Sequence, residues 1–176
     1  MSNCAGADVM KRNFWKIIMG VVSLAAVIAL IVWLGGQAAP TDSSEKISIQ
    51  GAEHIPVGAA HPSYNSNPPT SGWHYSEPAS WGIYNRELSD EQVVHNLEHG
   101  GIWISYKDID EETRLKLEKL AYRYPKSAIL TPRAKNDGKI SLAAWGRVLK
   151  LEAFDEGLIE QFIKKYRNKS PEPLAR

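Results

Sequence analysis

The stretch SDEQVVHNLEHGGIWISY, residues 89–106, encodes a short helix, a tight turn and a strand in succession. Ser89 and Gln92 have the spacing of a capping box, in which the two side chains satisfy backbone N–H groups at the start of a helix. Gly100-Gly101 predicts the end of that helix, because glycine readily adopts the left-handed conformation found there. The apolar run Ile102–Tyr106 then predicts a buried strand.

The chain after this stretch continues with helical and strand patterns. Amphipathic periodicity predicts helices over 108–124, ending before Pro125, and over 154–166. Apolar runs predict strands at 128–130 and 140–145, joined through a turn. The side chains expected to face the core are Leu115, Leu117, Leu120 and Ala121 in the first helix and Leu158, Ile159, Phe162 and Ile163 in the second.

The chain before this stretch has a different character. Residues 51–84 contain five prolines and four glycines and show no helical or strand period, although their aromatic residues favour an ordered loop. A short alternating segment at 47–49 predicts a first strand. This order of elements predicts one α+β domain over residues 47–168, with a mostly antiparallel sheet, helices on one face and a long Pro/Gly-rich ordered loop.

An apolar run near the N-terminus predicts a single transmembrane helix. Residues 17–34 carry no charge, and eleven of the eighteen are Ile, Val or Leu. At about 1.5 Å rise per residue, a helix of this length nearly matches a hydrocarbon core of about 30 Å. Trp15 and Trp33 lie at its two ends, where interfacial aromatic residues are common. A cleaved signal peptide is the alternative, because Gly36-Gln37-Ala38 resembles a cleavage site.

The basic residues around this run predict its orientation. Lys11, Arg12 and Lys16 precede it, and the next basic residue is Lys46. By the positive-inside rule, residues 1–16 remain in the cytoplasm. We therefore expect a single-pass protein of the cytoplasmic (inner) membrane whose main domain faces outward, on the periplasmic side. Its flexible linker is expected at 35–46 and a polar tail, which frays, at 169–176.

Charge and cysteine content limit the function classes. When the three basic residues and one acidic residue before the apolar run are set aside, 18 Lys and Arg face 19 Asp and Glu. A net charge of about −1 lacks the basic footprint of a nucleic-acid-binding protein, so we exclude nucleic acid as a main partner. The one cysteine, Cys4, precedes the apolar run. The outer domain therefore has neither a disulfide nor a thiolate ligand.

The histidines are confined to one part of the sequence. All five lie between His54 and His99, and the last 77 residues contain none. His95 and His99 are four residues apart on the predicted helix, so their Cβ atoms are about 5 to 6 Å apart on one face. His61 and His74 flank the segment PSYNSNPPTSGW, whose prolines restrict its path.

These positions predict a metal site with four histidine ligands: His61, His74, His95 and His99. Tyr64 and Trp73 are expected to line it. Neutral imidazoles suit one divalent ion, copper or zinc, whereas Cu(I) would favour soft ligands that the outer domain lacks. Each histidine could instead have a purely structural role, bonding a carbonyl or a helix end.

One motif also suits an enzyme. His95, Glu98 and His99 form H-x-x-E-H, the pattern of inverted zinc proteases, in which the glutamate is the general base. Those enzymes are larger and carry the motif within a long helix, so we favour metal binding, with Glu98 orienting a histidine, over hydrolysis with Glu98 as the catalytic base. A metal-free interaction module, with an envelope protein as partner, is the third possibility.

Three blocks of sequence together resemble a known family. They are HPSYNSNPPTSGWH (61–74), EPASWGIY (77–84) and VVHNLEHGGIWISY (93–106). In this combination the chain is similar, from about Ile47 to Arg167, to the bacterial Domain of Unknown Function family 3105. The resemblance implies that the proline loop and the histidine-bearing helix belong to one module, usually behind an N-terminal membrane segment. It implies no substrate and no particular metal.

Overall fold

The computed structural model describes residues 4–36 and 42–173, and it divides into two compact units, Met1–Thr41 and Asp42–Arg176. In the first unit, helix α1 (Cys4–Gly36) contains an apolar span, Asn13–Trp33, of 21 residues with mean hydropathy 2.4. None of that span is buried against other residues. By length and composition this helix suits a membrane anchor or a signal sequence. The predicted linker lies partly outside the described residues.

The second unit contains a six-stranded mixed sheet. Its strand order is β1-β8-β7-β5-β6-β4, in which β5 pairs in parallel with β6, and β6 with β4, while the other three pairs are antiparallel. This arrangement confirms an α+β fold with a mostly antiparallel sheet. The strands are β1 (Glu45–Lys46), β4 (Gly82–Ile83), β5 (Ile102–Tyr106), β6 (Ala128–Pro132), β7 (Ile140–Ala144) and β8 (Arg147–Leu151).

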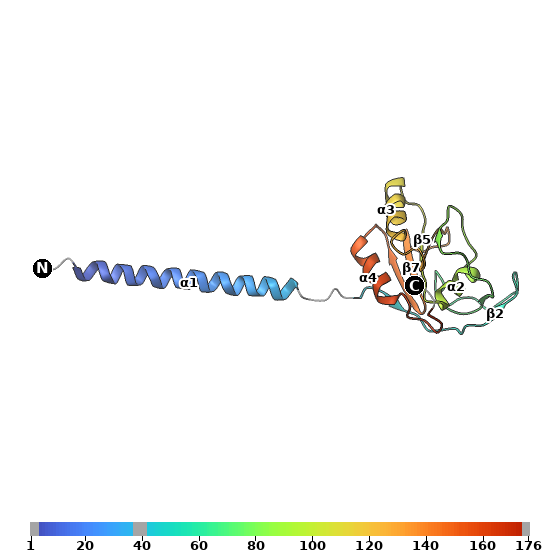
Figure 1. Ribbon diagram of the computed structural model, residues 1–176, viewed down its shortest axis with the longest axis horizontal. Coiled ribbons are helices and arrows are strands. Elements are labelled where there is room, and N and C mark those ends of the chain that lie inside the picture. The colour runs from blue at the N-terminus through green and yellow to red at the C-terminus, as the bar shows by residue number, and fades with distance from the viewer. Residues whose placement is uncertain (1–3, 37–41, 174–176) are drawn as a thin grey trace. The chain divides into compact units, whose positions relative to one another are not determined.

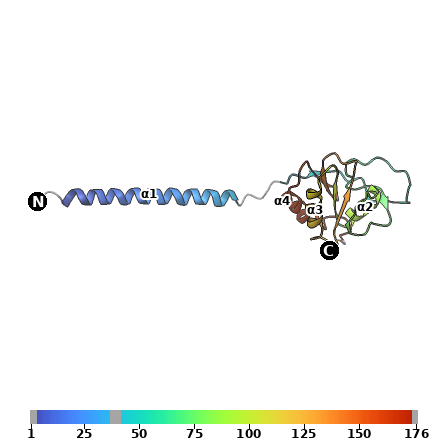
Figure 2. The same cartoon turned by 90° about the horizontal axis from the view of Figure 1, so that it is seen from above.

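Helices cover both faces of this sheet. Helices α3 (Glu111–Ala121) and α4 (Glu156–Tyr166) lie on one side and α2 (Asp90–Glu98) on the other (Figures 1 and 2). Along β5, Ile102 and Ile104 pack in the core cluster with α3 and α4, whereas Trp103 packs with α2. The expectation of helices on one face was therefore wrong, because successive strand side chains point to opposite faces and both are apolar in β5.

Several elements differ from the sequence prediction. The first strand lies at 45–46 instead of 47–49, and β8 had not been predicted. Leu115 is 51% exposed, although it was expected to face the core. It lies two positions before the buried Leu117, which places it about 200° away around the helix. The buried side of α3 follows the usual spacing of three and four residues.

The Pro/Gly-rich segment is built around two very short strands. Strand β2 (His54–Ile55) and strand β3 (His74–Tyr75) pair in parallel, and the peptide bond between Asn67 and Pro68 is cis. Asn96 of α2 holds this segment against the helix, because its side-chain amide donates to the Ala79 carbonyl and accepts from the Ala79 N–H. The segment therefore lies over α2.

A buried arginine joins the segment, the helix and the sheet. Arg133, which follows β6, is 4% exposed and makes two hydrogen bonds of 2.8 and 2.9 Å to the Asp90 carboxylate at the start of α2. It also donates to the side-chain oxygen of Asn67, just before the cis proline. A planar guanidinium suits such multiple contacts, and here it fixes the start of α2 relative to the loop.

Candidate metal centre

The pairing of β2 with β3 brings two histidines side by side. His54 and His74 are direct cross-strand partners, so their side chains leave the same face of the two-stranded sheet. Their ring centroids are 4.7 Å apart in an edge-to-face arrangement. Two further bonds, Gly72 N–H to Gly51 carbonyl and His74 N–H to Glu53 carbonyl, hold this register.

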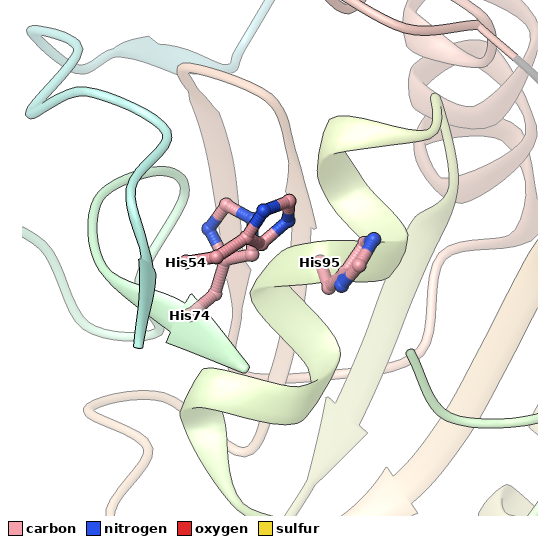
Figure 3. A group of neighbouring side chains, drawn as sticks. All are labelled: His54, His74 and His95. Atoms are coloured by element: carbon pink, nitrogen blue, oxygen red, sulfur yellow. The ribbon is translucent and has the colours of Figure 1, made fainter. Parts of the chain in front are cut away.

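Helix α2 adds a third histidine to this pair. The ring centroid of His95 lies 4.9 Å from that of His54 and 5.1 Å from that of His74. Among the described residues, these three form a group of possible metal ligands whose donor nitrogens all lie within 4.8 Å of one another. Figure 3 shows the rings of His54 and His74 beside the helix that carries His95. Nitrogens bound to one tetrahedral zinc lie about 3.4 Å apart, so the widest separation in the group needs to contract by up to about 1.4 Å.

Backbone carbonyls fix the orientation of the buried rings. His74 Nδ1 lies 2.7 Å from the Gly72 carbonyl oxygen, and His95 Nδ1 lies 2.6 Å from that of Tyr75. A carbonyl oxygen only accepts hydrogen bonds, so both Nδ1 atoms carry the proton. In the neutral rings the lone pair is then on Nε2. Metal-binding histidines show this pattern, in which the second ring nitrogen donates to a carbonyl or carboxylate.

Two Nε2 atoms lie at hydrogen-bonding distance from further side chains. His95 Nε2 lies 2.8 Å from His99 Nε2, and His74 Nε2 lies 3.0 Å from Glu98 Oε2. His54 Nε2 is 3.7 Å from the same carboxylate oxygen, which belongs to a side chain only 5% exposed. Facing acceptors repel one another unless a proton or a cation lies between them. The site is therefore chemically suited to bind a cation.

Burial favours the neutral form of His95. Burial lowers the pKa of His95, the hydrogen bond to the Tyr75 carbonyl opposes this shift, and the neighbouring rings of His99, His74 and His54 lower the pKa further. The net direction is downward from the ordinary value of 6.5. Near neutral pH the ring is uncharged, which is the protonation state that binds a metal ion.

The local sequence explains how α2 presents these groups. The Ser89 side chain accepts from the Gln92 N–H and caps the helix, as the capping-box pattern predicts. His95, Glu98 and His99 share one helix face because they are three and four residues apart. The helix is followed by Gly100, whose φ of +81° is the left-handed conformation expected there.

Of the four predicted ligands, three lie in or beside the histidine group and one lies apart from it. His74 and His95 belong to the group, and His99 contacts it through His95. His61 does not belong to it: its Nδ1 is 2.8 Å from the Pro62 carbonyl oxygen and its Nε2 is 3.1 Å from Glu91 Oε1. His61 therefore has two hydrogen-bonding partners of its own. Each of its ring nitrogens faces an acceptor outside the group.

The two predicted lining residues accompany His61. The His61 ring stacks on Trp73 with centroids 6.0 Å apart, and its centroid is 4.9 Å from that of Tyr64. The Tyr64 hydroxyl donates to the Trp73 carbonyl, and burial raises the pKa of Tyr64. Among the described residues, Trp145 lies next to the histidine group instead, edge-on to His74 with ring centroids 6.5 Å apart.

His54 is the group member that sequence reasoning missed. It lies in a two-residue strand without periodicity, and its partner His74 is twenty positions away. The one available signal was that His54 belongs to the same histidine-rich region as the other four. Proximity to the proline segment favoured His61 instead.

Comparison with protein families identifies the chain's relatives at family level. Residues 57–176 match a family model described as "Protein of unknown function (DUF3105)". The matched region contains His61, His74, His95 and His99 and begins three residues after His54. Comparisons with curated proteins and with solved structures found no match. The match covers more than half of the chain, which therefore belongs to the DUF3105 family.

Proposed function

We propose that this protein is a membrane-anchored metal-binding protein whose outer domain binds one divalent ion, copper or zinc, through His54, His74 and His95. The observation that carries the proposal is the convergence of the three rings, two of them held by backbone carbonyls through Nδ1, so that Nε2 is the nitrogen directed to a metal. Three neutral imidazoles are a common donor set for Zn²⁺ and Cu²⁺.

The exposure of the ligands indicates metal exchange rather than a permanent structural ion. His74 is fully buried and His95 is 5% exposed, but the side chain of His54 is 49% exposed. An ion at this position reaches solvent on the side of His54, and a ligand on a short peripheral strand moves aside at little cost. We therefore infer a role in metal handling or in the assembly of a metalloprotein.

The proposed location follows from the N-terminal unit. Helix α1 is long and apolar enough to span a membrane, and three basic residues precede its uncharged run. We propose that it anchors the protein in the cytoplasmic membrane with the N-terminus inside. The histidine-bearing domain then faces the periplasmic side, where metal ions arrive from outside the cell.

A metal titration of the full chain in detergent tests the proposal. Zn²⁺ and Cu²⁺ are titrated against a competing chelator into the wild type, His74→Ala, His95→Ala and His61→Ala. We expect one ion per chain, with affinity reduced about 100-fold or more by the first two substitutions because each removes a ligand. His61→Ala, in the same loop, should change affinity less than threefold. Equal losses in all three variants, or no binding by the wild type, would contradict the proposal.

A zinc-dependent hydrolase is the second candidate, and one observation favours it. Glu98 Oε2 lies beside the Nε2 atoms of both His74 and His54, where a carboxylate could orient a ligand or accept a proton from metal-bound water. Glu98→Gln keeps the shape of the side chain and removes the charge. In a hydrolase this variant retains zinc and loses turnover of model ester and peptide substrates. Loss of zinc would instead assign Glu98 to metal binding.

A metal-free envelope interaction module is the third candidate, because hydrogen bonds to carbonyls also fit structural histidines. Thermal unfolding with and without EDTA distinguishes it from a metal protein. The His95→Ala variant of a metal-free module is destabilised equally in both conditions. A metal-binding protein is stabilised by the ion, and that stabilisation disappears in EDTA or in the variant.

A further inference from the structure

The C-terminal segment Asn168–Glu172, here called the C-terminal strap, lies against the end of helix α2. After α4 the chain turns at Asn168, whose φ of +60° is in the left-handed region. The Asn168 N–H donates to the Gly100 carbonyl at 2.9 Å, and the Glu172 N–H donates to the Glu98 carbonyl at 3.2 Å. The strap thus satisfies carbonyl groups at the end of α2, which lack partners within the helix.

The strap and the end of α2 are in close contact. A Cβ atom added to Gly100 would lie 2.8 Å from the Asn168 Cα, closer than real Cβ contacts allow. This contact therefore requires glycine at position 100. Residues 169–172, which belong to the predicted polar tail, thus follow directly on this contact, and Glu172 hydrogen-bonds to α2. The strap therefore packs against the domain that carries the histidines.

The strap contacts His99 through one backbone atom. His99 Nδ1 lies 3.3 Å from the Glu172 carbonyl oxygen, while His99 Nε2 lies 2.8 Å from His95 Nε2. The carbonyl accepts a hydrogen bond and cannot donate one, so it favours the tautomer with the proton on Nδ1. In that tautomer the Nε2 lone pair of His99 points toward His95 and the histidine group.

We propose that the C-terminal strap is a positioning element of the metal centre, which makes His99 an additional ligand by fixing its tautomer. This inference rests on the proposed metal-binding function. Without the Glu172 carbonyl, His99 can carry its proton on Nε2 and donate it to His95 Nε2. That hydrogen bond occupies the lone pair with which His95 binds the metal, so loss of the strap weakens two ligands at once.

The test compares truncations of the full chain in detergent. A chain ending at Pro171 lacks the Glu172 carbonyl. A chain ending at Pro173 retains that carbonyl and, like the shorter chain, has a new C-terminal carboxylate, so it is the matched control. Glu172→Ala removes the side-chain carboxylate, 3.8 Å from His99 Nδ1, but keeps the carbonyl. The measurements are Cu²⁺ affinity and the number of coordinated imidazoles from pulsed electron paramagnetic resonance.

The chain ending at Pro171 should bind Cu²⁺ about 10- to 100-fold more weakly, the usual effect of removing an outer-shell partner, with one imidazole fewer. The chain ending at Pro173 and Glu172→Ala should stay within threefold of wild type. If all forms bind alike with the same imidazole count, the strap has no such role although the metal site stands. If the wild type binds no ion, both proposals fail.

His99→Ala keeps the inference testable if the shorter chain folds poorly. This substitution removes the ligand without altering the strap, so it should lower the imidazole count by one. Adding the Pro171 truncation to His99→Ala should then change Cu²⁺ affinity by less than threefold. An unchanged imidazole count in His99→Ala, or a further large loss on truncation, would overturn the proposal.

Discussion

The two faces of the sheet differ in what they bury. The face covered by α3 and α4 holds a cluster of side chains that, apart from the hydroxyl groups of its tyrosines, is apolar. The face covered by α2 and the Pro/Gly-rich segment buries an apolar patch together with histidines, a glutamate and an arginine. Apolar burial stabilises folding without fixing any chemistry, whereas buried polar groups require specific partners. We infer that the first face supplies most of the stability and the second supplies the site.

Two side-chain hydrogen bonds hold polar groups on the second face. Trp103 Nε1 donates to Thr131 Oγ1 at 2.9 Å, and Ser105 Oγ donates to the side-chain oxygen of Asn136 at 3.1 Å. Such a network costs free energy if one partner is lost, because the other stays buried without a partner. The comparison therefore predicts that substitutions on the two faces have different consequences.

The largest expected effect is on the apolar face. Phe162 of α4 is 2% exposed, and Phe162→Ala should lower the free energy of unfolding by about 4 kcal/mol, because it removes buried apolar area and leaves a cavity. Urea unfolding of the full chain measures this change. Metal affinity of the folded variant should remain within threefold of wild type. A small stability loss with a large loss of affinity would reverse the assignment of the two faces.

A second substitution is expected to lower both the free energy of unfolding and the metal affinity. Arg133→Met keeps much of the side-chain volume but removes the bonds to Asp90 and Asn67, and leaves the Asp90 carboxylate without its main partner. We expect a loss of about 3 kcal/mol in unfolding free energy. Because these bonds hold α2 against the loop, metal affinity should fall as well. Unfolding and metal titration of one preparation measure both changes. Full retention of metal affinity would show that the Arg133 contacts do not position the site.

The smallest expected effect concerns His61, the histidine outside the group. Burial lowers the pKa of His61, but the hydrogen bonds to Glu91 and to the Pro62 carbonyl, with the charge of Glu91, outweigh burial and raise it above 6.5. Protonated His61 therefore stabilises the folded state at low pH, and this contribution is lost as pH rises through the raised pKa.

Glu91→Gln tests this pH dependence. The side chains of His61 and Glu91 are 13% and 22% exposed, so we expect a loss of at most about 1 kcal/mol. The loss should be larger at about pH 6 than at about pH 9, where His61 is neutral in both proteins. Urea unfolding at the two pH values measures it. A loss that is independent of pH would mean that the contact does not depend on protonation of His61.

Local patterns in the sequence predicted much of the fold. The capping box at Ser89, the apolar run of β5 and the helix of α4 each depend on neighbouring residues, and each was found close to the predicted position. The strand β8 was missed because Arg147 and Lys150 interrupt its apolar pattern. The second helix-covered face was missed because one strand's pattern does not reveal what packs against it.

The histidine site was predictable only in part. The helix period places His95 and His99 together, and this pair is indeed in contact. The choice among loop histidines depends on which two-residue strands pair across the proline segment, which involves contacts between residues about twenty positions apart. The carbonyls of Gly72 and Tyr75 that orient the rings are backbone atoms, so no residue type in the sequence marks them.

The central claim is that His54, His74 and His95 bind one ion together, and X-ray absorption spectroscopy of the zinc-loaded full chain tests it most directly. We predict three or four imidazole nitrogens at about 2.0 to 2.1 Å from zinc. His54→Ala should remove one of these nitrogens, and His61→Ala should leave the spectrum unchanged. A spectrum that loses a nitrogen in His61→Ala but not in His54→Ala, or one without imidazole ligands, would contradict the account.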